Sequence, residues 1–98
     1  MSINIGICKI RLRLPENSSL KGKRNVIKSL IAQVNNKFNV SIAEVGDQDA
    51  WQIATLGVSC VSSDSQHNNE VLSKVVNFVD SGRFDIELLD YNIEILPV

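Results

Sequence analysis

Hydrophobic and polar residues alternate in several stretches of the chain, and the first such stretch predicts a strand. In residues 3–14 the even positions from Gly6 onward are small or apolar, whereas the odd positions are isoleucines at first and then Lys9, Arg11 and Arg13. Successive side chains of a strand point to opposite faces. One face of this strand is therefore expected to be apolar throughout, and the other to be apolar at one end and cationic at the other. Pro15 ends the strand.

Two other stretches have apolar residues at three- and four-residue spacing, which predicts helices that each bury one face. The first covers residues 19–36, with Ser19 or the serine before it as the N-cap. The second begins after Ser63, which can form a capping box with Gln66, and it ends at Gly82.

Three further strands are predicted over residues 40–45, 52–61 and 86–96, and the first two are joined as a hairpin by a polar loop. The element order is then β-α-β-β-α-β, the ferredoxin-like arrangement of the α+β class. Right-handed crossovers would place both helices on one face of a four-stranded antiparallel sheet with strand order 4-1-3-2. The length of 98 residues suits one domain, residues 1–98.

Composition narrows the class of protein. Hydrophobic residues make up 44% and charged residues 21%, as in an ordinary globular domain. The first residues do not resemble a signal peptide, and no apolar run approaches the roughly 20 residues of a membrane helix. Cys8 and Cys60 stand far apart, without a CxxC pattern, which argues against a zinc site or a disulfide framework. We therefore expect a cytoplasmic protein without membrane contact, metal or other cofactor.

The net charge of −1 hides an uneven distribution. Residues 1–43 hold eight lysines and arginines and one acid, whereas residues 44–98 hold two lysines and arginines and ten acids. Such asymmetry can mark an anion-binding face, or the two halves can neutralise each other within the fold.

The start of the first predicted helix is unusually cationic, with Lys21, Lys23, Arg24 and Lys28 in its first turns. A helix N-terminus is partially positive, so each cation there costs a few tenths of a kcal/mol. Gly22 inside the helix adds a further cost of roughly 1 kcal/mol relative to alanine at the same position. Together with free backbone N–H groups, the four cations would bind phosphate or another anion. The alternative is a solvated helix end neutralised by acids from elsewhere in the fold.

The cationic end of the first strand allows two interpretations. Lys9, Arg11 and Arg13 could lie over nucleic acid on the face of the sheet without helices. They could instead pair with Glu87 and Glu94 of the last strand, which should neighbour the first. Pairing of at least two of them is favoured.

Ile3, Ile5 and Ile7 fall on that same face and suggest a partner surface. A homodimer that packs sheet against sheet would bury them, as would a register that turns them into the core. Trp51, in the predicted hairpin loop, is either an exposed recognition residue or a cover for one end of the core.

No set of side chains forms a defensible catalytic site. Glu44, Asp47 and Asp49 could bind a metal, but acids that solubilise a loop are commoner. His67, the only histidine, is expected at the surface. A catalytic cysteine would need a histidine partner and a lowered pKa, and neither is evident. We therefore expect no enzymatic activity.

Several segments together have a specific combination of residues: 12–17, 19–24, 28–30, 38–45, 49–52, 54–58 and 89–96. They cover essentially the whole chain and resemble the YlxP-like family, a bacterial domain of unknown function. The resemblance implies a ferredoxin-like fold and no established activity. The genes of the family often lie beside those of translation factors and a ribosome-binding factor, which implies association with RNA or the ribosome.

Two binding functions follow from these observations. The first is a module whose Lys21, Lys23, Arg24 and Lys28 contact phosphates of RNA or the ribosome, although a pI near 5.7 counts against it. The first and third strands lack the aromatic residues that stack bases in RNA-recognition domains. The alternative is a self-associating or protein-interaction module that uses the uncovered sheet face. An enzyme for a phosphorylated small molecule ranks last.

Overall fold

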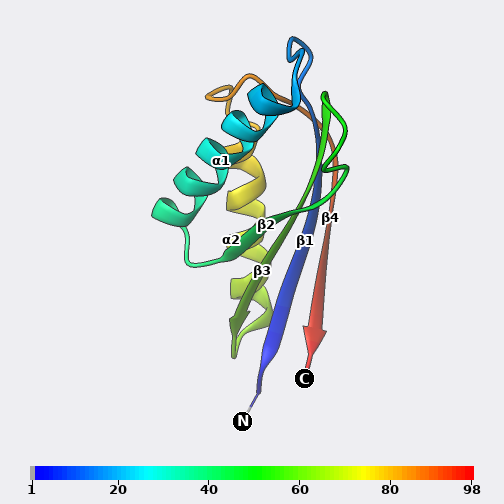
Figure 1. The fold of residues 1–98 in the computed structure, drawn as a ribbon. Helices are drawn as coiled ribbons and strands as arrows, with labels where there is room; N and C mark the ends of the chain where they lie inside the picture. The colour runs from blue at the N-terminus through cyan, green and yellow to red at the C-terminus, as the bar shows by residue number, and fades with distance from the viewer. Residues whose placement is uncertain (1) are drawn as a thin grey trace.

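Two helices cover one face of an antiparallel sheet, and within residues 2–98 no helix lies on the opposite face (Figure 1). The structure, a computed structural model, describes residues 2–98. Its elements are β1 (Asn4–Arg13), α1 (Leu20–Lys37), β2 (Ser41–Gly46), β3 (Ile53–Ser62), α2 (Ser65–Val79) and β4 (Glu87–Pro97). The four strands lie in the order β2-β3-β1-β4. The predicted ferredoxin-like α+β fold and its strand order are confirmed.

Side-chain caps fix where the helices begin. Ser19 is the N-cap of α1, and its hydroxyl accepts a hydrogen bond from the Gly22 N–H at 3.0 Å. The N-cap of α2 is Asp64, whose carboxylate accepts from the Gln66 N–H at 3.0 Å. The capping box predicted between Ser63 and Gln66 is therefore wrong. Asp64 takes that role because a carboxylate two residues before Gln66 reaches the same free N–H group.

The core lies between the helices and the sheet. Alternate residues of β1 and β3 and one stripe of each helix supply it, as the spacing in the sequence predicts. Its members with the least exposure are Cys8, Ile10, Leu12, Leu14, Leu30, Val34, Ala54, Leu56, Leu72, Val75 and Val79. Neither helix of residues 2–98 combines the length and apolar character needed to cross a membrane.

Ion pairs on the uncovered face link β1 to β4. Arg13 Nε lies 3.3 Å from Glu87, as one of the two interpretations predicts. Arg11 pairs at 3.4 Å with Asp90 rather than with Glu94. The register explains the difference, because it places Glu94 opposite an isoleucine of β1 and Asp90 opposite Arg11. Both pairs are solvent-exposed, so each contributes about 0–1 kcal/mol.

Both edge strands contain one extra residue. The pairing of β4 with β1 shifts between Arg11 and Leu12, which leaves Leu89 without a partner. The pairing of β2 with β3 shifts after Glu44, which leaves Val45 without one. Such β-bulges increase the local twist of a strand.

Helix α2 lies against β1 at Gly6. A Cβ atom at this glycine would lie 2.8 Å from Leu72 Cδ1 and 3.1 Å from Cys60 Sγ. The buried side chain of Asn68 also ties the helix to this strand, since its Nδ2 donates to the Asn4 carbonyl at 3.0 Å. The start of α2 therefore sits where β1 has no side chain.

This close approach predicts that Gly6→Ala lowers the free energy of unfolding by about 1–3 kcal/mol, the usual cost of overpacking. Gly57→Ala is the matched control. Its added Cβ would lie 3.1 Å from Val45 Cγ1, but Val45 is 56% exposed and can move aside. Urea unfolding of the two variants tests the prediction, and equal losses in both would contradict it.

Candidate functional site

Three of the four cations predicted to bind anions are exposed on α1, and the fourth is buried. Lys21, Arg24 and Lys28 recur at three- and four-residue spacing, so they share one side of the helix. We call these three residues the α1 cation row. Lys23 belongs instead to the buried stripe of α1, on the same side as Ile27, and its relative exposure is 0%.

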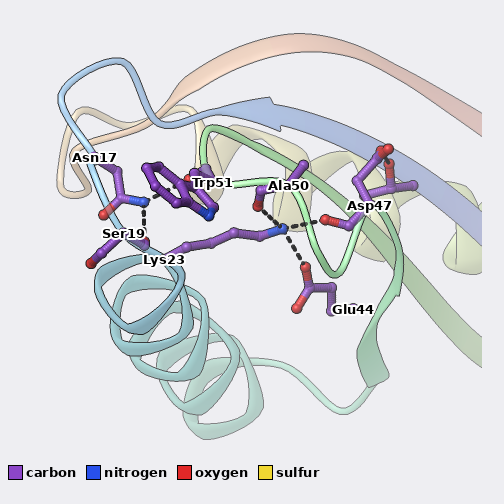
Figure 2. Close-up of polar contacts among 8 residues, drawn as sticks. Asn17, Ser19, Lys23, Glu44, Asp47, Ala50 and Trp51 are labelled. Atoms are coloured by element: carbon purple, nitrogen blue, oxygen red, sulfur yellow. Dashed lines mark hydrogen bonds and ion pairs between the residues drawn. The ribbon is translucent and has the colours of Figure 1, made fainter.

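The ammonium of Lys23 is held between α1 and the β2–β3 loop (Figure 2). Its Nζ lies 3.0 Å from Glu44 Oε2, donates to the Ala50 carbonyl at 2.8 Å, and donates to the Asp47 carbonyl. The ammonium therefore donates two hydrogen bonds to carbonyls and forms an ion pair with a carboxylate, although Glu44 Oε2 itself has no well-aligned hydrogen bond. The opposite charge and the two carbonyls together permit a positive charge at a buried position.

Lys23 is therefore unable to contact a phosphate, and its inclusion in the predicted anion site is wrong. The sequence contains a signal for this burial, because Lys23 precedes Ile27 and Leu30 at the spacing of the apolar stripe.

Two of the three acidic residues considered as metal ligands have partners within the fold. Glu44 forms the ion pair with Lys23. Asp47 accepts a hydrogen bond from the Thr55 hydroxyl at 2.7 Å. No group of three or more potential metal ligands comes together in residues 2–98.

The loop before α1 is bonded to the same hairpin. Asn17 Nδ2 donates to the carbonyls of Ser19 and Trp51, both at 2.6 Å (Figure 2). Gln52 Nε2 donates to the Asn17 carbonyl at 3.0 Å. A Cβ atom at Gly22 would overlap Asn17 Oδ1. Gly22 thus weakens the helix but leaves room for the asparagine. Protein groups, not an open anion site, occupy this side of the helix start.

Trp51 is 57% exposed at the tip of the hairpin. Of the two predicted alternatives, the structure has the exposed one. Its backbone carbonyl accepts a hydrogen bond from Asn17, so the backbone at Trp51 is held by the loop before α1.

Exposed aliphatic side chains gather at one end of the uncovered sheet face. The register sets Val61 and Leu96 on either side of Ile5, and the Val98 N–H donates to the Ile3 carbonyl at 2.8 Å. The exposed members are Ile3, Ile7, Val61, Leu96 and Val98, which are between 41% and 77% exposed. Ile5 is half-buried among them. We call these six residues the aliphatic patch. The three isoleucines thus lie on the predicted face.

The two cysteines lack the features of an activated nucleophile. Burial raises the pKa of Cys8 from 9.0 to about 11. Burial also raises the pKa of Cys60, whose thiol lies 3.5 Å from Asn68 Oδ1. Both groups are therefore protonated thiols near neutral pH, and the thiol is a poor nucleophile. His67 is exposed at the start of α2.

The anchoring of Lys23 predicts that Lys23→Met lowers the free energy of unfolding by about 3 kcal/mol, because it leaves Glu44 without its cation. Lys21→Met removes an exposed lysine from the same helix turn and should change stability by less than about 0.5 kcal/mol. Urea unfolding measures both. Similar small effects of the two variants would show that the Lys23 pair does not anchor the helix.

Structural comparison extends the fold assignment to known proteins. The first similar structure is "LarC2, the C-terminal domain of a cyclometallase involved in the synthesis of the NPN cofactor of lactate racemase, apo form", with a TM-score of 0.50 and 5% identity. That match covers all of this chain but only 58% of the other. The match to the "De novo designed protein Foldit4" has a TM-score of 0.47 at 13% identity, and it covers 96% of each chain. At such identity the LarC2 match shows the fold alone.

Sequence comparison identifies closer relatives. The chain is 42% identical over 77 residues to the "Uncharacterized protein YlxP" of Bacillus subtilis (strain 168), which covers 79% of this chain and 84% of that protein. Residues 5–93 match the family described as "Protein of unknown function (DUF503)". The YlxP-like resemblance of the sequence is thereby confirmed, and the chain belongs to the DUF503 family.

Proposed function

We propose that this protein acts by binding rather than by catalysis, and that its principal partner is a second copy of itself. The observation that carries the proposal is the aliphatic patch. Five of its six side chains are at least 41% exposed, and they adjoin one another at one end of the sheet. Contiguous apolar surface of this kind marks interaction sites on soluble proteins. Each half-exposed side chain adds roughly 1 kcal/mol when it is covered.

The charges beside the patch favour a second copy over an unrelated protein. Lys9 follows Ile7 on the same face of β1, and Glu94 of β4 lies directly opposite Ile7. Within residues 2–98 neither Lys9 nor Glu94 forms an ion pair. A two-fold axis repeats one patch on both partners. Such an axis through the patch can bring Lys9 of one copy to Glu94 of the other while the aliphatic side chains meet.

A binding role also agrees with the chemistry of the titratable groups. Burial raises the pKa of both thiols. The buried Lys23 is held by Glu44 and two backbone carbonyls. These features support a protein without a general base or nucleophile in a prepared position.

The α1 cation row supports a second candidate, association with RNA through phosphate contacts. Lys21, Arg24 and Lys28 are exposed on one helix side, and within residues 2–98 none forms an ion pair. Three contacts between these cations and phosphates would give a modest affinity for RNA, and that affinity would fall steeply as the salt concentration rises. The row lies on the helical layer, opposite the aliphatic patch, so the two functions are compatible in one molecule.

The homodimer predicts that Val61→Glu weakens self-association at least about tenfold, since it places a charge in the apolar contact. Val45→Glu is the control, because Val45 is similarly exposed on the same face but lies on β2, outside the patch. Sedimentation equilibrium at micromolar concentrations measures both. A monomeric wild-type protein, or equal weakening in the two variants, would refute the dimer.

Exchange of charges in the double variant Lys9→Glu, Glu94→Lys should leave association intact, whereas either single variant should weaken it.

The RNA candidate predicts that Arg24→Gln with Lys28→Gln reduces crosslinking of the protein to RNA in cells by about fivefold or more. The control pair Ser41→Glu with Gln48→Glu makes the same change in net charge on and beside β2. Recovered RNA is quantified after stringent washing. Equal recovery from wild type and both pairs would exclude the α1 cation row as an RNA contact.

A further inference from the structure

We propose that a groove between the C-terminal end of α1 and the side of α2 binds a ligand with more than one phosphate group. Two adjoining depressions, of about 360 and 400 Å³, share Lys37, Phe38 and Lys74 in their walls. Arg83 lines the far part of one depression, and His67 lines the other. This interhelical groove contains no residue of the α1 cation row, and it meets the aliphatic patch only at Val61, which lines the second depression.

The groove gathers cations from three separate segments. Lys37 ends α1, Lys74 lies on α2, and Arg83 lies in the loop before β4. All three are exposed, and within residues 2–98 none forms an ion pair. No aspartate or glutamate lines either depression. Asp85, close to Arg83 in sequence, lines a different cavity beside the β1–α1 loop.

Aromatic packing holds two of these charges close together. Lys37 Nζ lies 5.0 Å and Arg83 Cζ 5.4 Å from the centroid of the Phe78 ring. The two charges are therefore separated by no more than about 10 Å. This is similar to the Debye length of about 8 Å in physiological salt, so they still repel each other. A bound anion would relieve that repulsion.

Phe78 is a rigid support for this arrangement. Its ring makes edge-to-face contacts with Phe38 at 5.8 Å and Phe84 at 5.7 Å between centroids. The ring is 9% exposed, so packing on both sides fixes its orientation. Cation–π contacts to a fixed ring reduce the freedom that Lys37 and Arg83 would lose when a ligand binds.

The chemistry of the walls suits phosphate. Lysine and arginine supply only donors, and Asn77 and Ser81 add neutral donors in one of the depressions. Arginine matches phosphate with two parallel hydrogen bonds. Because two depressions meet at Lys37 and Lys74, an elongated ligand with several phosphates uses the groove more fully than a single phosphate. A free polyphosphate and a nucleic-acid strand share this chemistry.

The test uses sodium tripolyphosphate and a single-stranded oligouridylate as separate probes, with the full chain in low salt. Amide chemical shifts in ¹H–¹⁵N spectra should change at Lys37, Phe38, Lys74, Asn77 and Arg83 with at least one probe. Lys74→Gln and Arg83→Gln should each weaken that binding about fivefold to tenfold. The control Arg13→Gln removes an equal charge from the opposite face of the sheet, where Arg13 pairs only with the exposed Glu87, and it should leave binding unchanged.

Response to tripolyphosphate alone would assign the groove to a free phosphorylated ligand, and response to oligouridylate alone would assign it to nucleic acid. Either result supports the proposal. Absence of shifts with both probes, shifts confined to the start of α1, or equal weakening by Arg13→Gln would overturn it. So would equally strong binding of an oligoglutamate peptide, because the groove would then not select phosphate.

Discussion

The contact between Lys23 and the β2–β3 loop determines how the helical layer sits on the sheet. One ammonium meets a carboxylate and two backbone carbonyls, and all of these partners come from a hairpin that follows α1 in sequence. A buried pair of this kind adds little stability over an apolar one, but it accepts few alternative arrangements. The rotation of α1 is thereby set, with its apolar stripe inward and the α1 cation row outward.

The same anchor explains why the charge asymmetry of the sequence overstates the cationic surface. Lys23 is neutralised inside the fold, and Arg11 and Arg13 are paired on the sheet with acids of β4. What remains lies mostly on the helical layer. The sheet face is left with an apolar end, which makes the two faces of the molecule chemically different and suits them to different partners.

The sequence was sufficient for the fold because periodicity, caps and turns all favoured the same element order. Strand limits differ from prediction by a residue at each end, and Ser19 caps α1 as expected. Contacts between side chains that are distant in sequence were harder to predict. A lysine on an apolar stripe can be buried or exposed, and the sequence does not show that Glu44 lies beside Lys23. The interhelical groove was missed altogether, because Lys37, Lys74 and Arg83 are isolated in sequence and come together only when α1, α2 and the loop before β4 pack.

The bulges at Val45 and Leu89 bear on the kind of assembly that the molecule can enter. A sheet with two regular outer strands can add neighbours at both sides without limit, whereas a bulge interrupts the row of free backbone groups that such addition requires. Both outer strands of this sheet are interrupted in this way. Growth into fibres through the edges is therefore disfavoured, which agrees with the proposed face-to-face pair, an assembly that closes after two copies.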